Sequence, residues 1–194
     1  MLIPIAPDAA LPVAATCGAM RSTDAYLPAD LSCPADQGLT LAGNIALDLK
    51  NHKLIGTGSK QGTALSVQSG STPQIKNGTI QGWGAGITFI VPDDALSASG
   101  KATITGVTVT GNDVGVAGGG RRGLRHQASR FVSNRWGIGG VFTGSISVAG
   151  SAFQKNDKGA HVDTATLLVS TSRFDHNSTV VPCEEACHIL QTSS

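Results

Sequence analysis

One asparagine recurs at an almost constant spacing through the second half of this 194-residue chain. Asn112, Asn134, Asn156 and Asn177 are 22, 22 and 21 residues apart, and each follows a short alternation of apolar and polar residues. Two earlier segments, LDLKNHKLIGTG and PQIKNGTIQGWG, fit the same frame with glycine or threonine near the asparagine position, which makes six copies. Repeats of this length built from short alternating strands predict a solenoid, whose turns bury their faces only by stacking.

The composition favours strands and tight turns over helices. The chain contains 25 glycines and many β-branched residues, and no long segment has helical periodicity. A charged fraction of 14% and a net charge of +1 leave no overall field that would attract nucleic acid. No apolar stretch approaches the roughly 20 residues that a membrane helix needs. We therefore predict one all-β domain that binds neither nucleic acid nor membrane.

Four cysteines lie near the two ends of the repeats. Cys17 and Cys33 flank a short segment, whereas Cys183 and Cys187 are four residues apart. Four cysteines allow three pairings. We favour Cys17 with Cys33, and Cys183 with Cys187 as the second bridge. Bridged cysteines indicate an extracellular protein, and reduced ones a cytoplasmic protein. The chain divides into an N-terminal extension and cap over residues 1–36, repeats over 37–180 and a C-terminal cap or tail over 181–194.

The segment that follows Cys17 carries a more specific pattern. LPADLSCP is followed by GLTLAGNIALDLKNHKLIG, which ends at Gly56. This pattern resembles the start of bacterial right-handed parallel β-helix proteins of the pectate-lyase-like superfold, in which such a segment forms the N-terminal cap and the first turn, often with its two cysteines paired. The resemblance implies about six turns of three short strands each, with little or no α-helix. It does not imply one activity, because lyases, epimerases and phage tailspikes share this architecture.

Equivalent positions in successive turns indicate which residues face the core. The third strand is apolar in all six turns, and three of the five phenylalanines stack there as a core ladder. This ladder contains Leu54, Ile80, Val109, Phe131, Phe153 and Phe174. The second strand is expected to bury Leu49, Ile75, Ile104, His126, Val148 and Val169. His126 is the only polar member of this column, and it is either a hydrogen-bonded structural residue or a buried polar site.

The repeating asparagines are expected to lie at a turn between strands. Their side-chain amides can stack along the solenoid axis and bond the backbone of neighbouring turns. Asparagine also tolerates the left-handed backbone that such a corner needs. We interpret these asparagines as structural.

In the resembling enzymes the outer face of the first strands forms the floor of the substrate groove. With Leu65, Ile87, Val116, Ile138 and Ala160 facing inward, the outward residues include Thr88, Ile90 and Val141, followed by His161 and Asp163 in the last turn. Asp163 is placed to orient and charge-stabilise the imidazole of His161, so this pair is our catalytic candidate; a plain polar surface is the alternative. Trp83 and Trp136 directly precede first strands, where they either form a wall of the groove or cover turn backbone.

Arginines concentrate between residues 121 and 135, which hold five of the seven in the chain. Glycines flank Arg121 and Arg122, so these two side chains can close on a carboxylate or a phosphate, the alternative being a solvated loop. No zinc-ligand spacing and no phosphate-binding glycine loop is present in the sequence.

The expected floor is small and apolar in its middle, and Asp163 is its only acid. It therefore lacks both the acidic cluster that calcium-dependent lyases need and the paired carboxylates of glycosidases. We favour an enzyme that uses no metal or cofactor and that isomerises or cyclises a largely apolar, polyketide-like small molecule by holding it in a reactive geometry. The alternatives are a secreted carbohydrate-active lyase or epimerase and a non-catalytic β-helix binding or structural module. The chain is a monomer or an end-to-end or face-to-face homo-oligomer.

Overall fold

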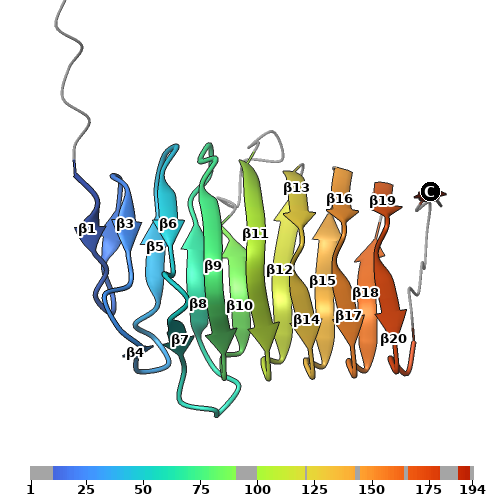
Figure 1. Ribbon diagram of the computed structural model, residues 1–194, viewed down its shortest axis with the longest axis horizontal. Coiled ribbons are helices and arrows are strands. Elements are labelled where there is room, and N and C mark those ends of the chain that lie inside the picture. The colour runs from blue at the N-terminus through green and yellow to red at the C-terminus, as the bar shows by residue number, and fades with distance from the viewer. Residues whose placement is uncertain are drawn as a thin grey trace, which may run out of the picture.

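The computed structural model shows a parallel β-solenoid of about six turns, with strands stacked along its long axis from β1 to β20 (Figure 1). The structure describes residues 11–90, 100–120, 122–142, 145–163, 166–179 and 188–192. Every regular element in these ranges is a strand, so the predicted all-β fold is confirmed. Within the same ranges, no helix has the length and apolarity that crossing a membrane requires.

The first strand of each turn belongs to a parallel seven-stranded sheet, which we call the first sheet. In axial order it contains β2 (Met20–Arg21), β5 (Leu39–Leu41), β8 (Thr63–Val67), β10 (Ala85–Phe89), β12 (Val114–Gly120), β15 (Trp136–Phe142) and β18 (Lys158–Asp163). The predicted register is confirmed, because Leu65, Ile87, Val116, Ile138 and Ala160 are paired across the strands and fully buried.

The second and third strands of the turns form a larger sheet of 14 strands, which we call the second sheet. Its second-strand members are β1 (Val13–Ala14), β3 (Ala25–Tyr26), β6 (Ala46–Asp48), β13 (Arg122–Gln127), β16 (Ser145–Ala149), β19 (Thr166–Ser170) and β21 (His188–Thr192). Its third-strand members are β4 (Leu31–Ser32), β7 (Lys53–Ile55), β14 (Arg130–Val132), β17 (Ala152–Gln154) and β20 (Arg173–Asp175). Two long strands, β9 (Gln74–Gln81) and β11 (Gly100–Thr110), supply both parts of their turns.

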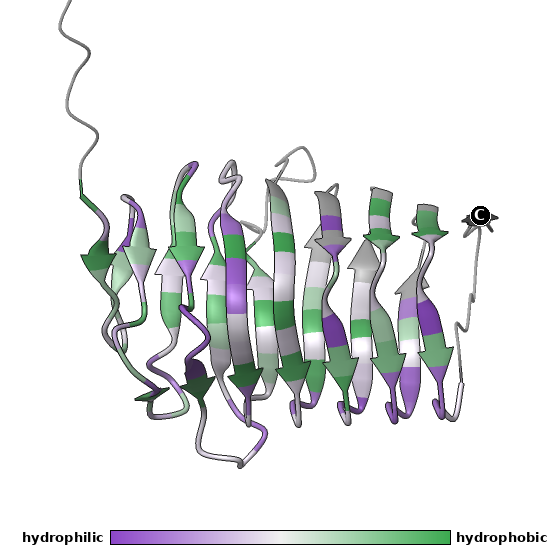
Figure 2. Ribbon diagram, in the orientation of Figure 1, coloured by the Kyte–Doolittle hydropathy of each residue, from purple (hydrophilic) through white to green (hydrophobic). Residues whose placement is uncertain are grey.

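The apolar ladder of the third strands is confirmed by the backbone register, which pairs its six residues in sequence along the axis. Phe131, Phe153 and Phe174 stack face to face, with centroid separations of 4.7 and 4.6 Å. Figure 2 shows the matching alternation of hydrophobic and hydrophilic residues along the strands. Burial on one face and exposure on the other therefore fix the register of each turn.

One member of the second-strand column was predicted wrongly. Leu47, and not Leu49, pairs with Ile75. Both leucines are fully buried, because Leu49 follows β6 at the corner and faces the same core two residues later. The backbone of His126 lies between Ile104 and Val148 as expected, but its side chain is outside the described part of the structure.

The repeating asparagines form a buried ladder at the corner before the first strands. Each Nδ2 donates to the third-strand carbonyl of the turn before it; for Asn134 this is the carbonyl of Val109, at 2.9 Å. The Oδ1 atoms of Asn134, Asn156 and Asn177 each accept from the backbone N–H and from the amide of the preceding asparagine, as Asn134 does from Asn112 at 3.0 and 3.1 Å. The left-handed backbone belongs to the residue before each asparagine (Gly111, Ser133, Lys155 and His176), so the expectation that asparagine itself adopts it is wrong.

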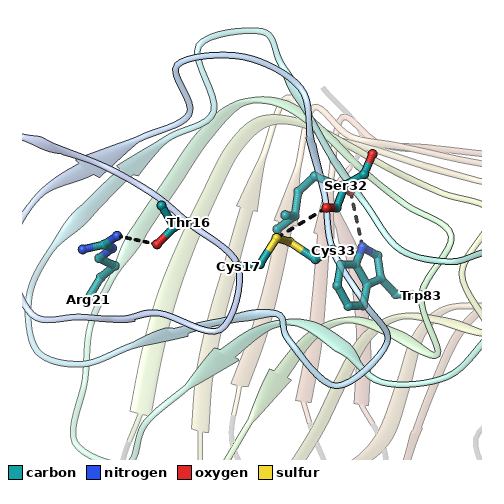
Figure 3. Close-up of a disulfide and its surroundings, with 7 residues drawn as sticks. Thr16, Cys17, Arg21, Ser32, Cys33 and Trp83 are labelled. Carbon is teal, nitrogen blue, oxygen red and sulfur yellow. Dashed lines mark hydrogen bonds between the residues drawn. A yellow bond between two sulfur atoms is a disulfide. The ribbon is translucent and has the colours of Figure 1, made fainter.

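The N-terminal end is closed by a disulfide. Cys17 and Cys33 are bonded, with their Cα atoms 5.5 Å apart, which confirms the favoured pairing (Figure 3). Cys183 and Cys187 lie outside the described residues. Strands β2, β3 and β4 already pair in parallel with β5, β6 and β7, so residues 20–32 form a first, short turn of the solenoid.

Candidate functional site

The outer face of the first sheet presents two columns of residues that run along the solenoid axis. The register places Met20, Thr40, Ser66, Thr88, Ala117, Gly139 and His161 in the first column. It places Thr63, Ala85, Val114, Trp136 and Lys158 in the second. The hydroxyl oxygens of Thr63 and Thr88 are 3.5 Å apart, which shows that the two columns are in contact on this face. The face therefore has a hydroxyl-bearing part toward the N-terminal end and an aromatic part further along.

Trp136 folds down across the outer face of its own strand and covers Gly139. A Cβ atom at position 139 would lie 2.3 Å from Cε3 of the indole, so only glycine leaves room for the ring there. His161 occupies the next turn in register with Gly139, and its ring centroid is 5.1 Å from that of Trp136, with the planes tilted by 56°. Trp136 is partly exposed, and the two rings form an aromatic platform on an otherwise small-residue face.

Two cations flank this aromatic platform. Cζ of Arg135 is 5.4 Å and Nζ of Lys158 is 5.2 Å from the indole centroid of Trp136, both within the range of a cation–π interaction. Arg135 also approaches the carboxylate of Asp113 at 3.6 Å. Both partners of this ion pair reach solvent, so the pair is weak and leaves the guanidinium available for a ligand. The corner beside the platform therefore presents two cations, together with the carboxylates of Asp113 and Asp157.

His161 is largely buried, with 8% of its surface exposed. The backbone of Asp163 continues β18 beyond it, but the side chain of Asp163 is outside the described part of the structure. The catalytic pair of these two residues therefore stays a prediction. The same holds for Val141, whose backbone pairs with that of Asp163 while its side chain is not described.

Trp83 does not line the first sheet. Its side chain is fully buried, its indole N–H donates to the carbonyl of Leu54 at 3.3 Å, and its backbone N–H donates to Oδ1 of Asn112 at 2.9 Å. Trp83 therefore does not form a wall of the groove. It covers turn backbone, which was the alternative. The indole lies in the core at the end that holds the disulfide (Figure 3).

The other residues that were expected to contact a ligand lie on both sheets. Thr88 lies in the first column, and Ile90, directly after β10, is 43% exposed. Arg121 lies outside the described residues, and the backbone of Arg122 begins β13 on the second sheet. Arg125 also belongs to β13, whereas Arg130 on β14 donates to Oε1 of Gln154 at 3.1 Å. The arginine cluster of the sequence is thus spread around the turn, and Arg135 is its member beside the platform.

Three residues next to the platform were not predicted from the sequence as site residues: Gly139, Arg135 and Lys158. A signal for the first was present, since Trp136 and Gly139 are three residues apart around a buried pair, and a glycine at an outward position leaves space for a neighbouring ring. The two cations were not identified because their distance from the ring depends on how the indole of Trp136 turns across its strand, which the register does not give. Among the described residues no three His, Cys, Asp or Glu side chains come together as a metal site.

The chain has no significant match to a known protein family, to a curated protein or to a solved structure. Its function is therefore argued from the geometry of the first sheet.

Proposed function

We propose that this protein is a pectate-lyase-like β-helix that binds an acidic polysaccharide along the outer face of the first sheet. The observation that carries the proposal is the partly exposed indole of Trp136, which covers Gly139 and lies close to the side chains of Arg135 and Lys158. An indole on a flat surface is a suitable stacking partner for a sugar ring, because it combines a large apolar face with a polar N–H. The neighbouring cations would bind carboxylates of uronate residues.

The rest of the face suits a chain that runs parallel to the solenoid axis. Thr40, Ser66 and Thr88 bring hydroxyl groups into one column toward the N-terminal end. Successive turns are about 4.8 Å apart, so the two turns from Gly139 back to Thr88 span on the order of 10 Å, about two sugar units. Hydroxyl groups there can donate to and accept from sugar hydroxyls. The disulfide favours an oxidising, extracellular compartment, where polysaccharides are found.

Cyclisation or isomerisation of an apolar small molecule remains a prediction from the sequence. That hypothesis rested on an apolar floor in the middle of the first sheet. The column that would be its floor carries the hydroxyl groups of Thr40, Ser66 and Thr88. These hydroxyl groups favour a sugar ligand over an apolar one.

Tryptophan fluorescence tests the proposal directly. The chain has two tryptophans, and Trp83 is fully buried, so a ligand-induced change in emission reports on Trp136. Titration with oligogalacturonates should give a saturable change that weakens with added salt, whereas neutral cello-oligosaccharides of equal length should bind at least about tenfold more weakly, because they gain no charge-assisted hydrogen bonds. Equal binding of both sugars would refute the acidic specificity, and no response to either would refute the proposal.

Matched variants locate the site by calorimetry. Trp136→Ala should abolish detectable binding, and Lys158→Gln should weaken it about tenfold, roughly 1.4 kcal/mol. Leu168→Ala removes another exposed side chain, on the second sheet, and should leave the affinity unchanged.

A further inference from the structure

A cavity of about 480 Å³ lies over the second sheet near its N-terminal end, on a different face from Trp136. Tyr26, Asp48 and Lys76 are consecutive members of one outward column in β3, β6 and β9, and they lie along its floor. Leu11 and Pro12 contribute an apolar rim, and Asp24 and Lys50 complete the charged lining. The size is in the range of cavities that bind small molecules.

Two of the four charged groups in this cavity neutralise each other. Oδ2 of Asp48 is 3.7 Å from Nζ of Lys76, and Oδ1 accepts from the backbone N–H of Lys50 at 2.9 Å and from Nδ2 of Asn77 at 3.3 Å. Partial burial opposes ionisation of this carboxyl, but these hydrogen bonds and the charges of Lys76 and Lys50 together hold the pKa of Asp48 below its ordinary value. Asp48 and Lys76 therefore form an ion pair with each other at the floor of the cavity.

The other two charged groups form no direct ion pair in the part of the chain that the structure describes. Oδ1 of Asp24 accepts from the backbone N–H of Ala46 at 2.8 Å, which leaves its negative charge without a cationic partner among those residues. The ammonium group of Lys50 likewise forms no ion pair with a described carboxylate. The carboxylate of Asp24 lies beside the first residue of β6, Ala46, and Lys50 follows the last residue of this strand by two positions. At about 3.3 Å per strand residue, the two ends of β6 beside which these groups lie are on the order of 10 Å apart.

We propose that this cavity binds a short zwitterionic peptide of two or three residues. Its N-terminal ammonium group pairs with Asp24, its C-terminal carboxylate pairs with Lys50, and an apolar side chain packs against Tyr26 and Leu11. A lone anion would pair with Lys50 but would be repelled by Asp24. A lone cation would pair with Asp24 but would be repelled by Lys50. A free α-amino acid carries both charges but is too short to span strand β6.

Tyr26 gives the experiment a single reporter, because it is the only tyrosine in the chain. With 3-fluorotyrosine incorporated, the ¹⁹F resonance should shift saturably on titration with Ala-Ala-Leu. The N-acetylated and the C-amidated forms of the same peptide each lose one charge and should bind at least about tenfold more weakly, as should free leucine. Equal shifts with the free and the capped peptides would overturn the proposal, as would the absence of any shift at millimolar peptide.

Two variants separate the charges from the shape of the cavity. Lys50→Gln keeps the backbone N–H that Asp48 accepts, and Asp24→Asn keeps an oxygen for the N–H of Ala46. Each variant should weaken binding of the free peptide about tenfold. Asp24→Asn should bind the free and the N-acetylated peptide equally well, and Lys50→Gln should bind the free and the C-amidated peptide equally well. Lys53→Gln on β7, an exposed lysine outside the cavity, is the control and should bind as the wild type does. Unchanged binding in Lys50→Gln would refute the site. Oligosaccharide binding at Trp136 is measured separately, so the two proposals fail or stand independently.

Discussion

The two halves of the solenoid are held together in different ways. From Asn112 to Asn177 the turns have nearly equal length, and their corners share one ladder of buried amides. In the N-terminal half the equivalent residues Leu39, Leu65, Ile87 and Val116 are 26, 22 and 29 residues apart, and no such ladder occurs among the described residues there. A disulfide and a buried tryptophan lie in that half instead. The amide ladder thus coincides with the turns of constant length, and the disulfide and the buried tryptophan with the turns of variable length.

Trp83 joins the two halves because it occupies the ladder position one turn before Asn112. Its backbone N–H donates to Oδ1 of Asn112, as each asparagine N–H does to the next asparagine. Its indole N–H donates to the carbonyl of Leu54, the position that Nδ2 of Asn112 reaches one turn later at Ile80. The indole thus replaces the amide as hydrogen-bond donor and fills the core with its ring, and the amide ladder ends there.

Replacing Asn134 by alanine should have the largest effect on the ladder. The change removes the donor to the carbonyl of Val109 and the acceptor of two N–H groups of Asn112, all of them buried. Each unsatisfied buried group costs about 1–3 kcal/mol, so we expect a loss of about 3–5 kcal/mol in the free energy of unfolding, measured by chemical denaturation. Asn177→Ala, at the partly buried end of the ladder, should cost about 1–2 kcal/mol, since water reaches the groups that it leaves. Equal losses in the two variants would show that solvent access at Asn177 does not lower the cost of the lost hydrogen bonds.

The disulfide should stabilise only the N-terminal half. A bridge between residues 16 apart contributes about 3 kcal/mol in the chain-entropy model, and the double variant Cys17→Ser, Cys33→Ser should lose about that amount. Amide hydrogen exchange should accelerate at Cys33 (serine in this variant) and Leu27, which donate to the next turn at 2.8 and 3.0 Å, and should be unchanged at Asn134. Acceleration at Asn134 of the same size would mean that the two halves unfold as one unit.

Much of this fold was predictable, because apolar residues at one position in every turn admit a single register. The third-strand ladder from Leu54 to Phe174 is the clearest case. The sequence ALDLK was ambiguous, since two leucines two residues apart are both buried and only the pairing with Ile75 separates Leu47 from Leu49. The position of Trp83 was recoverable in principle: GWGAGI aligned on GNDVGV places it opposite Asn112.

The candidate site was less predictable than the fold. The outward column from Thr40 to His161 follows from the register and was largely anticipated. The platform itself depends on how the Trp136 ring turns at a corner and on which cations lie beside it in the neighbouring turn. Such side-chain directions are decided by packing between turns, which a pattern within one turn does not contain. A glycine at an outward position, as at residue 139, is the local clue that a ring covers the strand.

Two substitutions distinguish the two functions of the Trp83 side chain. Trp83→Phe keeps an aromatic ring in the core but leaves the carbonyl of Leu54 without its donor, so we expect a loss of about 2 kcal/mol in the free energy of unfolding. Trp83→Asn restores an amide at the ladder position but removes most of the buried ring, and the resulting cavity should cost about 3–5 kcal/mol. Thermal and chemical denaturation of both variants against the wild type measure the difference. If Trp83→Asn were the more stable of the two, the amide and not the ring would be the decisive contact at this position.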